Sequence, residues 1–135
     1  MKKIVWLTLV LMVMFTAVVC ANGIYDAEVV WTDVPNESLS GITYAYAPEF
    51  TSISPTGRLA TVIKTTQPNG YTTIEKIYVN SSFDQYIVVA CGKFKQDGST
   101  IKIVPDADKA WRQLLPATLQ DQCLQTAYQY AKTKQ

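Results

Sequence analysis

Three cysteines are the residues of this chain whose chemistry depends most on where the chain folds. Cys20 ends an apolar N-terminal run, whereas Cys91 and Cys123 lie in the body of the sequence. Two thiols in an exported domain most often pair, and the alternative is two separate buried cysteines. A bond closing the loop from Cys91 to Cys123 would contribute about 3 to 4 kcal/mol in the chain-entropy model. We therefore predict a structural disulfide between Cys91 and Cys123.

Enzymatic chemistry has little support in the residue types. The chain contains no histidine, which is the usual base for a serine or cysteine nucleophile and the commonest transition-metal ligand. Asp106 and Asp108 lie two residues apart in a polar turn, where solvated loop carboxylates are a simpler interpretation than a paired-acid site. Ser38 and Ser40 have the same interpretation. We predict no catalytic residue, no metal site and no cofactor.

The N-terminus has the form of a secretory signal peptide. Met1–Lys3 is basic, and residues 4–19 are apolar apart from two threonines. The residues before Asn22 fit cleavage after Ala21, which gives a signal peptide at residues 1–21. One alternative is lipidation of Cys20, although Val19 stands where the lipoprotein pattern has a smaller residue. The other alternative is an uncleaved membrane anchor, but the apolar run at residues 4–19 is shorter than the roughly 20 residues of a spanning helix.

Residues 22–135 are enough for one modest core and so predict a single domain. Without Lys2 and Lys3, the chain has about one more acid than base, against a formal net charge of +1 for the whole sequence. Lysines and acids are scattered rather than gathered on a basic face with aromatic residues. We therefore predict no nucleic-acid partner.

Alternating apolar residues predict five to six strands before a single helix. Asn69–Gly70 and Asp97–Gly98 favour tight turns between neighbouring strands. Residues 106–115 are assigned to a turn or short helix, and residues 48–57 to a loop. The expected strands are Ile24–Trp31, Ile42–Ala47, Leu59–Thr66, Tyr71–Val79, Tyr86–Phe94 and Thr100–Val104.

The final helix is expected from Thr118, with Pro116 near its first turn. Apolar and small residues recur every four positions, which gives the helix one apolar face. They are Leu119, Cys123, Ala127 and Ala131. On the strand Tyr86–Phe94, strict alternation places Cys91 with Ile87 and Val89, on a face expected under the helix. The sequence therefore predicts an α+β domain, an antiparallel sheet with one C-terminal helix packed on one face and tethered by the disulfide.

Aromatic residues could line a binding surface or fill the core. For Trp31 and Trp111, core packing is the stronger interpretation because large aromatic side chains supply much of a small core. The tyrosines are left open between the two interpretations, since an alternating strand can expose one row. They are Tyr44, Tyr46, Tyr71 and Tyr78.

From about Thr72 to Tyr130 the chain resembles the surface-adhesin protein E family of Gram-negative bacteria. The matching features are a strand ending in a cysteine, a glycine turn, a tryptophan before a proline and a helix with a second cysteine. They are carried by Tyr86–Cys91, Gly98, Trp111–Pro116 and Leu119–Cys123.

The resemblance implies an antiparallel sheet whose concave face is joined to the C-terminal helix by a disulfide. It also implies an exported, non-enzymatic protein of the periplasm or outer-membrane surface that binds host matrix or serum proteins and can form a homodimer. The alternative is a periplasmic protein of the same fold that acts in envelope assembly or inhibits an enzyme. Attachment to a membrane is expected only if Cys20 is lipidated.

Overall fold

The computed structural model describes residues 23–36 and 40–135. The predicted signal peptide and Cys20, the candidate lipidation site, lie outside the described residues, as does Ser38. Within the described ranges, no helix is long and apolar enough to span a bilayer.

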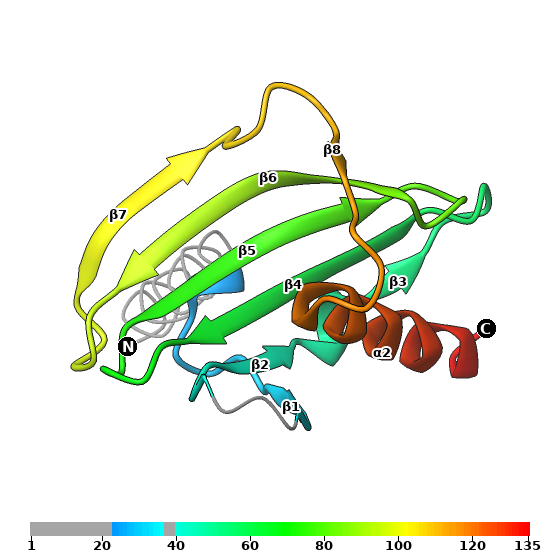
Figure 1. Ribbon diagram of the computed structural model, residues 1–135. Helices are drawn as coiled ribbons and strands as arrows, with labels where there is room; N and C mark the ends of the chain where they lie inside the picture. The colour runs from blue at the N-terminus through cyan, green and yellow to red at the C-terminus, as the bar shows by residue number, and fades with distance from the viewer. Residues whose placement is uncertain (1–22, 37–39) are drawn as a thin grey trace, which may run out of the picture.

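The described chain forms one antiparallel sheet of eight strands with one α-helix against it (Figure 1). Six strands lie in the order β1-β2-β4-β5-β6-β7, while β3 pairs with β4 and β8 pairs with β6. The strands are β1 (Thr32–Val34), β2 (Thr43–Tyr46), β3 (Ser52–Ile53), β4 (Leu59–Thr66), β5 (Thr72–Val79), β6 (Gln85–Phe94), β7 (Thr100–Pro105) and β8 (Arg112–Gln113). The remaining elements are the 3-10 helices η1 (Gly23–Tyr25) and η2 (Pro48–Phe50) and the helix α2 (Leu119–Thr133).

The α+β class, the antiparallel pairing and the C-terminal helix agree with the sequence prediction, whereas the strand count of five to six is wrong. Two strands of two residues each, β3 and β8, pair with long neighbours at places where the sequence indicated a loop and a turn. The first strand is also displaced. Residues 24–31 form η1 and an irregular segment, and pairing begins only at Thr32.

Two tight turns connect the long strands as predicted. Gly70 and Gly98 both have a φ of +87°, a conformation that a residue without a Cβ adopts readily. The amide of Gly70 donates to the carbonyl of Gln67 at 2.9 Å, and that of Gly98 donates to Lys95 at 2.9 Å.

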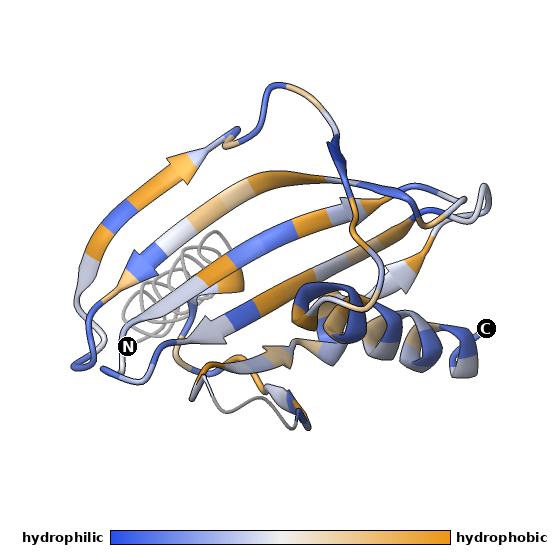
Figure 2. Cartoon of the chain, viewed as in Figure 1, coloured by the Kyte–Doolittle hydropathy of each residue, from blue (hydrophilic) through white to orange (hydrophobic). Residues whose placement is uncertain are grey.

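The sheet separates two apolar clusters. The face that carries α2, called the helix face below, holds the larger cluster, in which Leu59, Ile77 and Leu124 are fully buried. On the opposite face, called the far face, the N-terminal segment covers a smaller cluster that contains Val62 and Ile74. Figure 2 shows hydrophobic segments along the central strands and hydrophilic residues on the outer side of α2.

A bulge in β6 changes which residues share a face. Ile77 pairs with Val88 and Lys76 with Ala90, so Val89 is an additional residue in the ladder. Directly opposed residues lie on the same face. Cys91, which pairs with Glu75, therefore shares the helix face with Val88, while Ile87 lies on the far face. The prediction that Ile87, Val89 and Cys91 form one row is wrong because strict alternation ends at the bulge.

Helix α2 begins later than Pro116. Its N-cap is Thr118, whose side-chain oxygen accepts from the amide of Asp121 at 3.1 Å. The Asp121 carboxylate in turn accepts from the amide of Ala117 at 3.0 Å. These reciprocal bonds satisfy backbone donors that the first turn leaves free, and so define the start of the helix.

The predicted disulfide is absent, since Cys91 and Cys123 are both free thiols. Helix α2 packs against β2, β3 and β4, whereas Cys91 lies on β6, two strands beyond β4. At about 4.8 Å per strand, that offset is roughly 10 Å, beyond the roughly 7 Å limit between the Cα atoms of a disulfide. Periodicity placed both cysteines on the correct face but did not determine where across the sheet the helix lies.

Candidate functional site

The helix covers only part of its face, and a polar pocket lies on the part beside it. The pocket has a volume of about 320 Å³ and is formed by β2, β4, β5, β6, β8 and the first turn of α2. We call it the Glu75–Arg112 pocket. Its lining residues are Tyr44, Ile63, Thr65, Gln67, Thr73, Glu75, Tyr86, Arg112 and Gln120.

Strand register explains why polar side chains meet here. Thr65 pairs with Thr73, and Ile63 pairs with Glu75, so these side chains point to the helix face. Further along the same rows, Leu59 pairs with Val79 and both are buried. The helix face is therefore apolar at one end of β4 and β5 and polar at the other.

Glu75 is the carboxylate in this pocket and is partly withdrawn from solvent. Burial raises the pKa of its carboxyl above the ordinary value; Arg112 and Lys93 oppose this shift, and Asp108 adds to it. The Glu75 carboxylate is thus held among basic groups without a direct ion pair among the described residues. It is an acceptor that a ligand ammonium or N–H group can reach.

Arg112 is the cation of the pocket, and Asp108 fixes its position. The Asp108 side chain is only 6% exposed, and its second oxygen accepts from the amide of Val88 at 2.9 Å. The first oxygen accepts a charge-assisted hydrogen bond from Arg112. This bond with Asp108 is the main reason why the pKa of the guanidinium is raised. At 57% exposure, Arg112 retains N–H donors for a ligand.

Tyr86 supports the same guanidinium. Its buried ring lies beneath Arg112, with 6.0 Å between the guanidinium carbon and the ring centroid. Tyr86 also pairs directly with Arg112 in the ladder between β6 and β8. The short strand β8, which sequence analysis missed, is thus the element that presents Arg112.

No family model, curated protein or solved structure matches this chain. The resemblance to the protein E family therefore stays a prediction. The chemistry of the pocket, with hydroxyl, amide, carboxylate and guanidinium groups together, suits a polar ligand that both donates and accepts hydrogen bonds. In residues 23–36 and 40–135, no three His, Cys, Asp or Glu side chains form a group that could hold a metal ion.

The residues singled out from the sequence lie at separate places. Asp106 is exposed, whereas Asp108 is the buried anchor just described and not a solvated loop residue. Ser40 is exposed, and its hydroxyl accepts from the amide of Ile42 at 3.4 Å. Trp31 packs against the far-face cluster, and Trp111 lies under the Arg58 guanidinium at 5.2 Å.

The tyrosines do not form one aromatic surface. Tyr44 and Tyr46 lie on the helix face, where Tyr46 is buried and its ring packs at 5.6 Å from that of Tyr130. Tyr78 lies on the far face beside Lys76, and Tyr71 is 42% exposed at a strand end. Tyr44 alone among these four lines the Glu75–Arg112 pocket.

The two cysteines have different environments. Cys123 is fully buried, and burial raises the pKa of its thiol to about 12. Cys91 is half-buried, and its pKa is raised chiefly by burial and then by Glu75. Both thiols are therefore protonated at neutral pH, and neither has the lowered pKa of a catalytic nucleophile.

We expect a thiol-directed alkylating reagent to modify Cys91 in the folded protein and to reach Cys123 only after unfolding. Because the pKa of Cys91 is raised, the rate of its alkylation should keep increasing as the pH rises above the ordinary thiol pKa of about 8.5. Mass spectrometry of timed samples measures both sites. A Cys91→Ser variant is the control and should stay unmodified while folded. If neither thiol reacts in unreduced, denatured protein, the two are oxidised and the structure is contradicted.

Proposed function

We propose that this chain is an exported, non-enzymatic binding protein of the cell envelope or cell surface, and that its partner is a protein. The basic and apolar N-terminus supports export, and the resemblance to protein E adhesins supports a role in binding. The observation that carries the proposal is the open Glu75–Arg112 pocket on the helix face.

The pocket suits part of a protein ligand because it offers both a negatively and a positively charged group in fixed positions. A chain end or a polar side chain brings donors and acceptors that match Arg112, Glu75 and the neighbouring hydroxyls. Arg112 is already oriented by Asp108, so it loses little freedom on binding. The partner's flanking residues would then rest on the surrounding polar rim.

A photo-crosslinking amino acid at Thr73, which lines the pocket, tests this proposal. The processed protein carrying it is irradiated with two separate mixtures, an isolated envelope fraction and an extracellular-matrix extract. We expect a discrete protein adduct that disappears when Arg112→Glu is added, because that change places a second carboxylate beside Asp108. An adduct with matrix protein supports the adhesin function, and one with envelope protein supports a periplasmic role.

A further inference from the structure

The outer edge of β7 carries backbone groups that can pair with another strand. β7 is last in the strand order, and no described strand pairs with its outer side. The amide of Asp106 donates to Val89 at 2.9 Å, and the register continues through Val104 and Lys102. Because hydrogen-bonded pairs alternate, Val104 and Lys102 bond to β6, whereas Ile103 and Pro105 face outward. Ile103 offers both an N–H and a C=O group at this edge, and Pro105 offers a C=O group alone.

The two sides of this edge have different chemistry. Ile103, opposite Gly92 on the far face, is 49% exposed. Ile101 is 47% exposed and is the additional residue at a bulge, because Lys93 pairs with Lys102 and Phe94 with Thr100. Lys102 lies on the helix face, directly opposite Lys93. An added strand would therefore meet apolar groups on one side and ammonium groups on the other.

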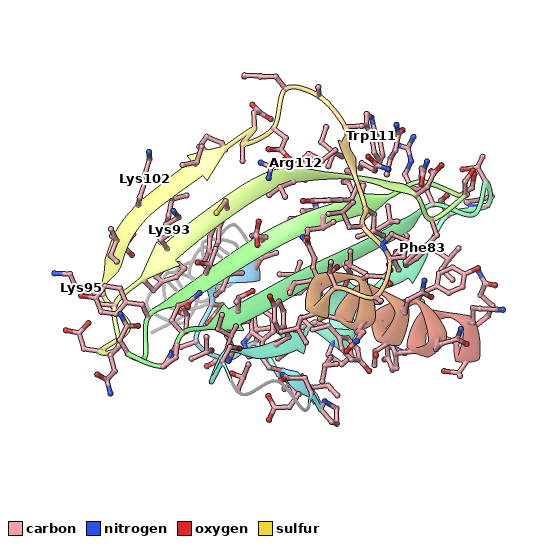
Figure 3. All side chains as sticks on the ribbon, viewed as in Figure 1. Phe83, Lys93, Lys95, Lys102, Trp111 and Arg112 are labelled. Atoms are coloured by element: carbon pink, nitrogen blue, oxygen red, sulfur yellow. The ribbon has the colours of Figure 1, made fainter. Side chains whose placement is uncertain are left out.

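Three lysines gather at this end of the sheet. Four lysines elsewhere lie over aromatic rings: Lys64 over Trp31, Lys76 over Tyr78, Lys132 over Tyr128 and Lys134 over Tyr130. In the part of the chain that the structure describes, Lys93, Lys95 and Lys102 have neither a ring partner nor an ion pair, and the same holds for Lys109 in an exposed loop. The charge of Lys93 also acts on Glu75. Figure 3 shows these three near the end of the molecule where β6 and β7 meet.

Lys93 and Lys102 are a directly opposed pair of like charge, an arrangement that destabilises a sheet. A negative group placed between or beside them would relieve the repulsion. The same lysines disfavour pairing of β7 with a second copy of the chain, since that would bring further ammonium groups together.

We propose that β7 accepts an extended acidic segment of a partner protein as an added antiparallel strand. The segment's backbone pairs with Ile103, its acidic residues face Lys102 and Lys93, and an alternate apolar residue covers Ile103. This edge lies beside the Glu75–Arg112 pocket, since the Lys93 charge acts on Glu75. Ile103 and Lys102 do not line the pocket, so backbone pairing at β7 is tested separately from the proposed function.

The test is a titration of the isotope-labelled processed protein with synthetic peptides of six residues, the length of β7. One peptide alternates glutamate and valine, and the other alternates lysine and valine. We expect the glutamate peptide to shift the amide signals of Lys102 and Ile103. We expect the lysine peptide to bind at least about tenfold more weakly, because it brings like charges together.

Two controls separate charge from backbone pairing. The double variant Lys93→Glu and Lys102→Glu should reverse the preference between the peptides, whereas Lys109→Glu, in an exposed loop, should not. A glutamate peptide that is N-methylated on its pairing edge should lose binding, because the ladder then lacks donors.

Equal binding of both peptides, or full binding of the N-methylated peptide, would overturn the proposal. Signal shifts confined to residues of the Glu75–Arg112 pocket would also overturn it. So would binding of the protein to anionic phosphatidylglycerol vesicles without any binding of the glutamate peptide, since the edge would then be a membrane contact.

Discussion

Replacing Leu124 with alanine should lower the free energy of unfolding by about 2 to 5 kcal/mol, the usual cost of truncating a buried leucine. Leu124 is fully buried in the cluster between α2 and the sheet. No disulfide holds this helix, so apolar packing is what attaches it. Urea unfolding followed by circular dichroism measures the change. Gln125→Ala is the matched control. Gln125 follows Leu124 in the helix and its side chain is exposed, so its truncation should leave the free energy of unfolding nearly unchanged.

Reductant provides the complementary measurement on the unmodified protein. A bond between Cys91 and Cys123 would contribute about 3 to 4 kcal/mol, so reduction would lower the melting temperature by about 10 °C or more. We expect no change on adding dithiothreitol. A large decrease would contradict attachment of the helix by packing alone.

Replacing Gly92 with alanine should destabilise the domain by about 1 to 3 kcal/mol through overpacking. A Cβ at this position would lie 2.6 Å from the Tyr25 ring and 2.9 Å from the Phe94 ring. Both rings belong to the far-face cluster, and Tyr25 anchors the N-terminal segment there. We therefore expect a melting temperature several degrees lower and loss of hydrogen-exchange protection around Tyr25.

A double-mutant cycle identifies the cause of the destabilisation by Gly92→Ala. Gly92→Ala should lower the free energy of unfolding much less in a Tyr25→Ala background, because the closest ring is gone. In a Tyr25→Phe background the cost should be unchanged, since the ring remains and the Tyr25 hydroxyl has no hydrogen-bond partner in the described structure. An equal cost in all three backgrounds would show that the Tyr25 contact is not responsible.

Local patterns predicted the long strands, the turns at Gly70 and Gly98, and the final helix. These features depend on side-chain alternation, on φ preferences and on helical spacing, which are all properties of neighbouring residues. Three of the missed features depend on residues that are distant in the sequence. They are the bulge at Val89, the two-residue strand β8 and the lateral position of α2.

The wrong disulfide prediction follows from the lateral position of α2. The local spacing of apolar residues determines the face of a strand or helix on which a residue lies. Packing across the whole sheet determines which strands the helix covers. Cysteine arithmetic gave no information on that position. The structure puts Cys123 near the tyrosines of β2 and Cys91 between β5 and β7.

One residue of the candidate site, Glu75, has a signal in the sequence. Glu75 shares a strand row with Ile77 and Val79, and a charged residue within an inward-facing row often marks a functional position. Arg112 had no comparable signal, because its place beside Glu75 depends on β8. The prediction of a solvated Asp108 is wrong because a loop sequence does not reveal that this carboxylate accepts from the amide of Val88.

Crosslinking from opposite faces of β5 tests most directly whether the helix face is the binding surface. Thr73 lines the Glu75–Arg112 pocket, and its neighbour Thr72 points to the far face. We predict that the crosslinker at Thr73 captures a discrete partner and that Arg112→Glu abolishes this adduct, while Thr72 gives none of it. The same adduct from Thr72, or an adduct from Thr73 that survives Arg112→Glu, would contradict binding at the pocket.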